Sequence, residues 1–214
     1  MHITNLLLFG GSFDPPHWGH IKTACSVQAM FHFQKFVFLP CNTPVLKGAT
    51  QASAQQRTDM LTLALTDYPE FSIDLREIQR ETPSYMVDTL KSLREELGLN
   101  CTITLLLGYD AFLQLPQWHD WQALITLANL LIVQRPGTQK TTVPTALTAL
   151  LQQHQTKDKT TLLNCPHGMI YQLNAGSYSI SSTMIRTQLQ QHQDVSLYLP
   201  KPVYEYIKQQ ALYQ

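Results

Sequence analysis

Charged side chains are scarce in this sequence of 214 residues: they make up 14% of it, against about 25% in an average soluble protein. The 15 basic and 15 acidic residues cancel, so the chain lacks the broad positive field that attracts a nucleic-acid backbone or an anionic membrane surface. It also lacks any apolar run near the ~20 residues of a membrane span. We therefore expect neither nucleic acid nor membrane as a partner, and any recognition of phosphate groups must be local.

Cysteine pairs at metal-binding spacing are missing as well. The four cysteines are Cys25, Cys41, Cys101 and Cys165, and with no CxxC pair among them reduced thiols are the simplest interpretation. The N-terminal residues show no cationic region ahead of a long apolar stretch, which a secretory signal requires. These absences favour a cytoplasmic location and argue against a metal site built by the chain itself.

The sequence does contain an alternation of short apolar runs with longer segments of helical spacing. Strands are expected over residues 6–9, 36–39, 71–73, 102–107, 130–133 and 170–173. Helices are expected over residues 21–31, from a capping box at 53–56 to about 65, and over 85–97, 183–191 and 203–212. Strands with two apolar faces, joined by helices, predict a Rossmann-like, doubly wound α/β fold: a mainly parallel sheet with helices on both faces.

Residues 138–168 form the one looser stretch, rich in threonine, glutamine and lysine. A single helix over residues 146–153, followed by an exposed loop, is expected there. Neither an internal repeat nor a linker interrupts the sequence. Residues 1–214 are therefore predicted to form one domain.

Residues 10–20, GGSFDPPHWGH, connect the first expected strand to the first helix. In an open parallel sheet this is the crevice where ligands bind, and free amides at a helix start attract anions. The spacing is neither GxGxxG nor that of a P-loop, which argues against hydride transfer and P-loop hydrolysis. His17 and His20 share one helix face. They are either a helix cap and a partly buried helix residue, or two hydrogen-bond donors to one phosphate.

Residues 180–186, ISSTMIR, place three hydroxyl side chains and an arginine where a loop is expected to become a helix. Hydroxyl groups at a helix start ordinarily cap its amides. Three in succession, followed by Arg186, also offer several donors and a permanent positive charge to a triphosphate or a leaving pyrophosphate. Two such helix starts, far apart in sequence, fit a site that holds a polyphosphate from two sides.

These two segments resemble the nucleotidyltransferase family that carries the (T/H)xGH motif, and residues 10–20 are most similar in form to the bacterial nicotinate mononucleotide adenylyltransferases. The resemblance implies transfer of the adenylyl group of ATP to nicotinate mononucleotide, giving nicotinate adenine dinucleotide and pyrophosphate in NAD biosynthesis. It implies catalytic roles for His17, His20 and Arg186, and Mg²⁺ carried by ATP. The ATP-binding residues that it implies are Gly10, Gly11, Ser12, Phe13, His17, His20, Gly108, Asp110, Ser181, Ser182, Thr183 and Arg186.

The middle of the chain carries the residues expected to bind the second substrate. Asp110, just after the strand over residues 102–107, either caps a short helix or contacts a ribose hydroxyl. By the resemblance, Trp118 stacks on the nicotinate ring, and main-chain amides nearby bind the carboxylate of that ring. The implied substrate-binding residues are Ser84, Tyr85, Met86, Trp118, His119, Arg135 and Lys47.

Two places depart from the family pattern. Met86 stands where relatives commonly have threonine, and Val45 and Leu46 replace a proline and a histidine. Lys47 is accordingly either a substrate contact or a solvated surface charge. Arg135 either contacts a phosphate or pairs at the surface.

Other functions stay open from the residues alone. One is adenylyl transfer to nicotinamide mononucleotide or to another phosphate ester such as phosphopantetheine. Another is a nucleotide-binding module without turnover. An RNA-binding synthetase relative is disfavoured by the zero net charge and by the missing tRNA-sized extra domain.

Overall fold

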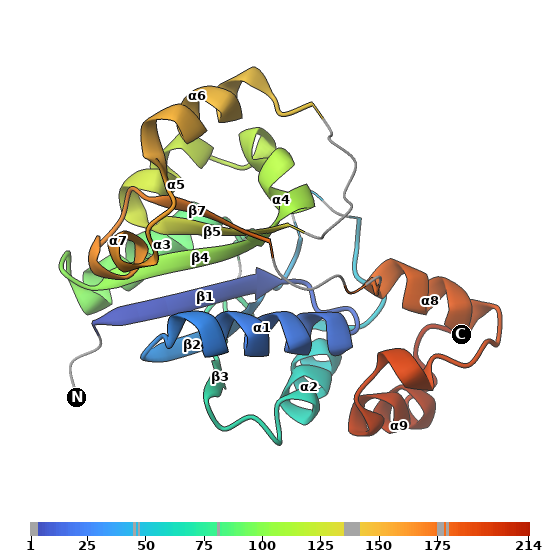
Figure 1. Ribbon diagram of the computed structural model, residues 1–214. Coiled ribbons are helices and arrows are strands. Elements are labelled where there is room, and N and C mark those ends of the chain that lie inside the picture. The colour runs from blue at the N-terminus through green and yellow to red at the C-terminus, as the bar shows by residue number, and fades with distance from the viewer. Residues whose placement is uncertain are drawn as a thin grey trace.

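The computed structural model describes residues 4–44, 46, 48–80, 82–134, 142–174, 178 and 180–214. At its centre lies a seven-stranded sheet in the order β3-β2-β1-β4-β5-β7-β6, in which all neighbouring strands are parallel (Figure 1). The strands are β1 (Asn5–Gly11), β2 (Lys35–Pro40), β3 (Phe71–Ile73), β4 (Thr102–Gly108), β5 (Asn129–Gln134), β6 (Gln155–Thr156) and β7 (Ile170–Asn174). The helices are α1 (Trp18–Phe31), α2 (Ala54–Ala64), α3 (Met86–Leu97), α4 (Tyr109–Leu113), α5 (Trp121–Leu127), α6 (Thr145–His154), α7 (Lys159–Asn164), α8 (Ser182–Gln190) and α9 (Lys201–Gln209), with two 3-10 turns, η1 (Leu115–Gln117) and η2 (Ser196–Tyr198).

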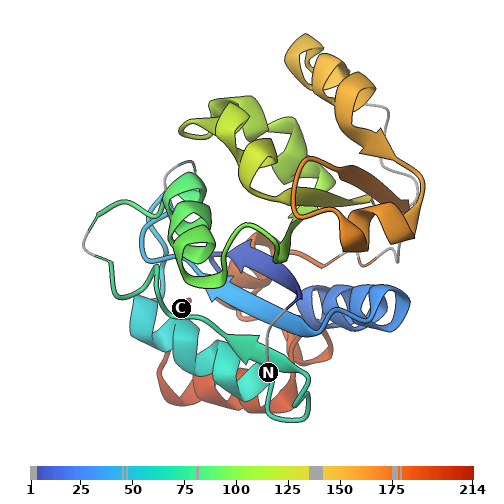
Figure 2. The same ribbon diagram turned by 90° about the vertical axis from the view of Figure 1, so that its left-hand side faces the viewer.

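Each face of the sheet is covered by its own set of helices (Figure 1, Figure 2). Successive side chains of a strand point to opposite faces. Leu7 of β1 accordingly packs in one core with α1, α2, α8 and α9, whereas Leu6 and Leu8 pack in a second core with α3, α4, α5 and α6. The predicted doubly wound α/β fold is thereby confirmed.

Local sequence signals account for several helix ends. Ser53 and Gln56 form the predicted capping box at the start of α2. Gly98 ends α3 with a φ of 79°, a conformation that glycine adopts readily. In α1 the buried residues recur at two-, three- and four-residue steps, and the helix face that they form packs against the sheet.

The strand order changes direction between β1 and β4. The chain runs from β1 through α1 to β2 on one side, and β4 pairs with β1 on the other side. Connections that leave two strand ends in opposite directions open a crevice outside those ends. Gly11, at the end of β1, and Gly108, at the end of β4, therefore border the expected ligand position.

The prediction of an exposed loop after the helix over residues 146–153 was wrong in part. That segment contains the short strand β6 and the helix α7. The carboxylate of Asp158 caps α7 by accepting the main-chain N–H groups of Thr160 and Thr161. The amide of Asn129, a buried residue of β5, donates to the main-chain oxygens of Leu162 and Cys165. Tertiary contacts thus order a segment whose composition resembles a loop.

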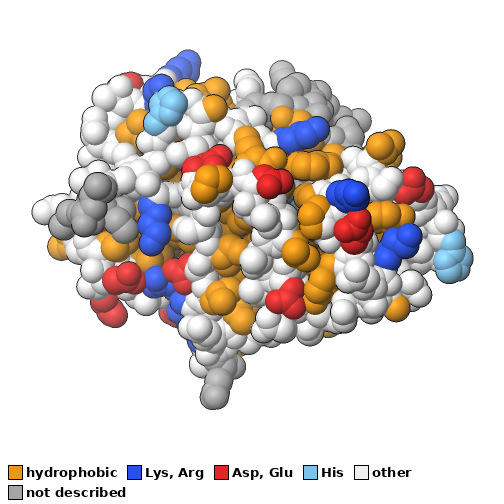
Figure 3. Space-filling model, turned by 90° about the horizontal axis from the view of Figure 1, so that it is seen from below, with side chains coloured by type: hydrophobic (Ala, Val, Ile, Leu, Met, Phe, Trp, Pro, Cys, Tyr) orange, Lys and Arg blue, Asp and Glu red, His pale blue; other side chains and the backbone are white. Residues whose placement is uncertain are grey.

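The surface agrees with the balanced charge of the sequence. On the face seen from below, basic and acidic side chains lie interspersed with apolar ones (Figure 3). Within the ranges that the structure describes, none of the helices is both long and apolar enough to cross a membrane.

Candidate active site

His17 and His20 are held at the start of α1 by a reciprocal pair of hydrogen bonds. The main-chain N–H of Gly19 donates to Nδ1 of His17 at 3.1 Å, and the main-chain N–H of His17 donates to Nδ1 of His20 at 3.2 Å. Because each Nδ1 accepts a hydrogen bond, each neutral ring carries its proton on Nε2. The ring centroids are 3.8 Å apart. The helix start therefore fixes two adjacent imidazoles in one tautomer.

Close contacts keep these rings in place. The Phe13 ring meets the His20 ring edge-on, with 5.1 Å between centroids. A Cβ atom added at Gly19 would lie 2.8 Å from the His17 ring, and one added at Gly11 would lie 3.0 Å from the Phe13 ring. A side chain at Gly19 would therefore displace the His17 ring, and one at Gly11 would press on the Phe13 ring.

Two hydrogen bonds join the start of α8 to the loop before α1. The Ser182 hydroxyl donates to the main-chain oxygen of Pro15 at 2.9 Å. The guanidinium of Arg186 donates through Nη1 to the main-chain oxygen of Asp14 at 2.7 Å. Ser181 caps α8 by accepting a main-chain N–H of its first turn. The structure therefore brings together the two segments that the sequence singled out.

A cavity of about 690 Å³ lies where these segments meet, beside the ends of β1 and β4. Small-molecule sites commonly measure about 300–1,000 Å³. Asp110 lines the cavity from the first turn of α4 with an exposed side chain. Over the described ranges, His, Cys, Asp and Glu side chains do not gather in threes as a metal site. Every residue implied as ATP-binding lines this cavity: Gly10, Gly11, Ser12, Phe13, His17, His20, Gly108, Asp110, Ser181, Ser182, Thr183 and Arg186.

A second cavity of about 210 Å³ adjoins the first and shares the glycines at the ends of β1 and β4 with it. The rings of Tyr85 and His119 lie against each other in its wall, with 4.3 Å between centroids and a tilt of 31° between the ring planes. Tyr85 and Met86, at the N-terminal end of α3, both line this cavity, so the positive end of that helix dipole lies beside it. The predicted substrate residues Ser84, Tyr85, Met86, Trp118 and His119 all line it.

Two other predicted substrate residues, Lys47 and Arg135, lie outside the described residues. Pro44 and Leu46, which the structure does describe, line the second cavity.

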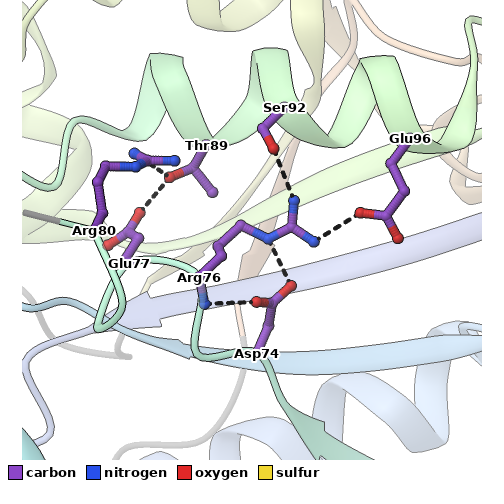
Figure 4. A network of polar contacts seen from close by, with 7 residues as sticks. All are labelled: Asp74, Arg76, Glu77, Arg80, Thr89, Ser92 and Glu96. Atoms are coloured by element: carbon purple, nitrogen blue, oxygen red, sulfur yellow. Dashed lines mark hydrogen bonds and ion pairs between the residues drawn. The ribbon is translucent and has the colours of Figure 1, made fainter.

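A polar network beside the second cavity was not singled out from the sequence (Figure 4). Glu77 is only 2% exposed and contributes to the cavity wall. Its carboxylate accepts a hydrogen bond from the Thr89 hydroxyl at 2.7 Å, and Arg80 donates to the same hydroxyl oxygen at 3.3 Å. Burial raises the pKa of the Glu77 carboxyl above its ordinary value, and the Thr89 bond and the Arg80 charge oppose that shift.

Arg57 is a second residue that sequence reasoning missed. It is fully buried, and its guanidinium donates to the main-chain oxygens of Ser12, Cys41 and Asn42, each at 2.8 Å. One side chain thereby links the loop after β1 to the loop after β2. Its three-residue spacing from Met60 places it on the buried face of α2, which is the signal that was available.

Comparison with known proteins agrees with this geometry. Residues 8–188 match the cytidylyltransferase-like family, a class of nucleotidyltransferases. A protein of Legionella pneumophila (strain Paris) named "Probable nicotinate-nucleotide adenylyltransferase" is 51% identical over 98% of this chain and 99% of its own length. A protein of the same name from Marinomonas sp. (strain MWYL1) is 36% identical over 99% of this chain and 96% of its own length. The chain belongs to the cytidylyltransferase-like family and, within it, to the nicotinate-nucleotide adenylyltransferases, as the resemblance implied.

A solved structure shows the same fold. It is the nicotinic acid mononucleotide adenylyltransferase of Plasmodium falciparum complexed with NaAD, with a TM-score of 0.72. The match covers 98% of this chain and 97% of that one at 22% sequence identity. At that identity the likeness concerns the arrangement of the sheet and helices.

Proposed function

We propose that this chain transfers the adenylyl group of ATP to nicotinate mononucleotide, giving nicotinate adenine dinucleotide and pyrophosphate in NAD biosynthesis. The 5′-phosphate oxygen of the mononucleotide attacks the α-phosphorus of ATP in line, and the bond from that phosphorus to the oxygen of pyrophosphate breaks. A phosphate monoester is already anionic near neutral pH, so the reaction needs positioning and charge stabilisation rather than a strong base.

The observation that carries this proposal is the meeting of the α1 and α8 starts at one cavity, beside two adjacent imidazoles. His17 and His20 donate through Nε2 to the α-phosphate and its bridging oxygen, where negative charge grows. Arg186 binds the departing pyrophosphate. Its bond to the main-chain oxygen of Asp14 uses one N–H, and a guanidinium carries five. Ser181, Ser182 and Thr183 supply further donors at the positive end of α8.

The second cavity is the proposed site of the pyridine ring. Trp118 is half-buried in its wall and offers a flat surface for stacking. The positive end of α3, at Tyr85 and Met86, favours a carboxylate over a neutral amide on that ring, and Asp88 in the same first turn offsets part of this preference. This electrostatic preference is the support for nicotinate rather than nicotinamide mononucleotide.

Nucleotidyl transfer from ATP generally uses a divalent metal ion on the phosphates, and we propose Mg²⁺. Such an ion binds largely through phosphate oxygens and water, which fits a cavity wall with the exposed carboxylate of Asp110. We further propose that residues 1–214 act as one nucleotidyltransferase domain. A cytoplasmic location is proposed because the four cysteines are thiols.

A side-by-side assay with the acid and amide mononucleotides tests the proposal. Purified protein with ATP and MgCl₂ receives either nicotinate or nicotinamide mononucleotide, and dinucleotide and pyrophosphate are quantified. We expect equal amounts of both products, with kcat/KM about 5- to 30-fold higher for the acid, as one partly buried helix-end interaction of about 1–2 kcal/mol allows. A preference for the amide, or no pyrophosphate with either substrate, would contradict the proposal.

A further inference from the structure

Tyr213 reaches the loop before α1 from a position 199 residues later in the sequence. Its hydroxyl donates to Oδ1 of Asp14 at 2.6 Å. The side chains are 6% and 3% exposed, so water has little access to the pair. A hydrogen bond to a buried charged group is among the stronger ones in proteins.

Asp14 connects four parts of the molecule. Its carboxylate accepts the main-chain N–H of Gln51 at 2.9 Å and that of Ala52 at 3.2 Å, in addition to the Tyr213 hydroxyl. Its main-chain oxygen accepts Arg186 at 2.7 Å. The loop before α1 is therefore tied through this one residue to the segment before α2, to α8 and to Tyr213.

The loop that Asp14 holds is strained and must be placed accurately. Phe13 has a φ of 48°, which a bulky side chain rarely adopts. Such strain persists only where the surroundings determine the conformation. The same loop carries His17, and His17 in turn orients His20. A small shift at residue 14 would therefore move both imidazoles relative to the phosphate.

The Tyr213 hydroxyl is suited to a permanent donor role. Ala211 and Tyr213 themselves have positive φ values of 48° and 64°, so the chain is bent to bring this ring to Asp14. Burial raises the pKa of the hydroxyl, and the hydrogen bond to Asp14 and its negative charge raise it further. The group stays protonated throughout the neutral range.

We propose that Tyr213 is a positioning residue for adenylyl transfer, which holds the Asp14 carboxylate and thereby the loop that carries the paired imidazoles. The expected effect on kcat rests on the proposed function. The expected effect on the loop rests only on the contacts of residue 14.

The test compares Tyr213→Phe with a matched control, Tyr206→Phe. Tyr206 of α9 donates to the carboxylate of Asp59 in α2 at 2.9 Å, and neither residue lines a cavity described above. Each variant therefore removes one tyrosine–aspartate hydrogen bond and keeps the ring. The measurements are kcat and KM for both substrates, the melting temperature, and deuterium exchange of the main-chain amides of residues 12–20.

We expect Tyr213→Phe to lower kcat by about 5- to 50-fold, as the loss of one hydrogen bond to a charged group allows, with KM for the mononucleotide changed less than about twofold. Amide exchange over residues 12–20 should rise. Tyr206→Phe should leave kcat and this exchange near wild-type values, even if it lowers the melting temperature as much as Tyr213→Phe does. A folded Tyr213→Phe protein with wild-type kcat and exchange, or equal losses in both variants, would overturn the inference.

The two proposals fail in different ways. Wild-type protein without transfer to either mononucleotide refutes the proposed function, while amide exchange still decides whether Tyr213 holds the loop. Wild-type protein with full activity and an unaffected Tyr213→Phe variant refutes only the inference about Tyr213.

Discussion

Replacement of Gly19 by alanine tests the geometry of the paired imidazoles most directly. An added Cβ would lie 2.8 Å from Cε1 and 2.9 Å from Nδ1 of the His17 ring, whereas ordinary contacts begin near 3.4 Å. The ring must therefore move away by about 0.6 Å to restore an ordinary contact. That shift breaks the bond from the Gly19 N–H to His17 and disturbs the contact between the His17 and His20 rings.

The effect on stability and the effect on catalysis should differ in size. Alanine in place of glycine favours a helix by about 0.5–1 kcal/mol, and loss of an N-cap hydrogen bond costs about 1 kcal/mol. The gain in helix propensity and the loss of the cap therefore nearly cancel in the free energy of unfolding. A displacement near 1 Å in a catalytic group can cost about 10²-fold in rate. We therefore expect Gly19→Ala to lower kcat by roughly 10- to 100-fold while the free energy of unfolding changes by less than about 1 kcal/mol.

The assay combines steady-state pyrophosphate release with urea unfolding, and Ser26→Ala serves as the control. Ser26 lies on the same helix, outside both cavity walls, and its replacement also raises helix propensity. It should keep full activity. A Gly19→Ala protein with wild-type kcat would show that the His17 ring position does not matter to the reaction and would refute the reasoning.

Three further changes address other parts of the site. His20→Ala should lower kcat at least about 10²-fold, as loss of a single transition-state donor does; a near-normal single-turnover rate would remove this role. Trp118→Ala should raise KM for the mononucleotide about tenfold or more, from the loss of one stacking contact, and Trp118→Phe should recover part of it; equal KM values would contradict stacking. Because burial raises the folded-state pKa of Glu77 above its unfolded value, wild-type stability relative to Glu77→Gln should be highest below the unfolded pKa and should decline as pH rises through the folded pKa. Urea unfolding of both proteins at acid and neutral pH measures this, and a difference that stays constant with pH would argue against it.

Several features could be predicted from the sequence because their causes are local. The alternation of apolar runs and helical spacing reflects which faces of each element are buried, and it led to the parallel sheet and to most helices. Ser53 with Gln56 and Gly98 mark helix ends through their own backbone and side-chain preferences. The histidine pair and the hydroxyl run were recognisable because several groups with phosphate chemistry stand within a few residues of one another.

Other features depended on the packed chain. The short elements β6 and α7 escaped prediction because they are held by tertiary hydrogen bonds, such as those of Asn129. In the sequence, Arg57 and Glu77 look like ordinary polar residues. The structure shows that both are buried and hydrogen-bonded to fixed partners.

The sequence by itself determined most of the elements, the fold class and the two segments proposed to bind phosphate, because hydrophobic periodicity and helix caps act over a few residues. Only the tertiary structure decided that Asp14 lies between Arg186 and Tyr213, and that the two segments border one cavity. The physical reason is that a contact between residues far apart in the chain depends on how whole helices and strands pack, which no local pattern encodes.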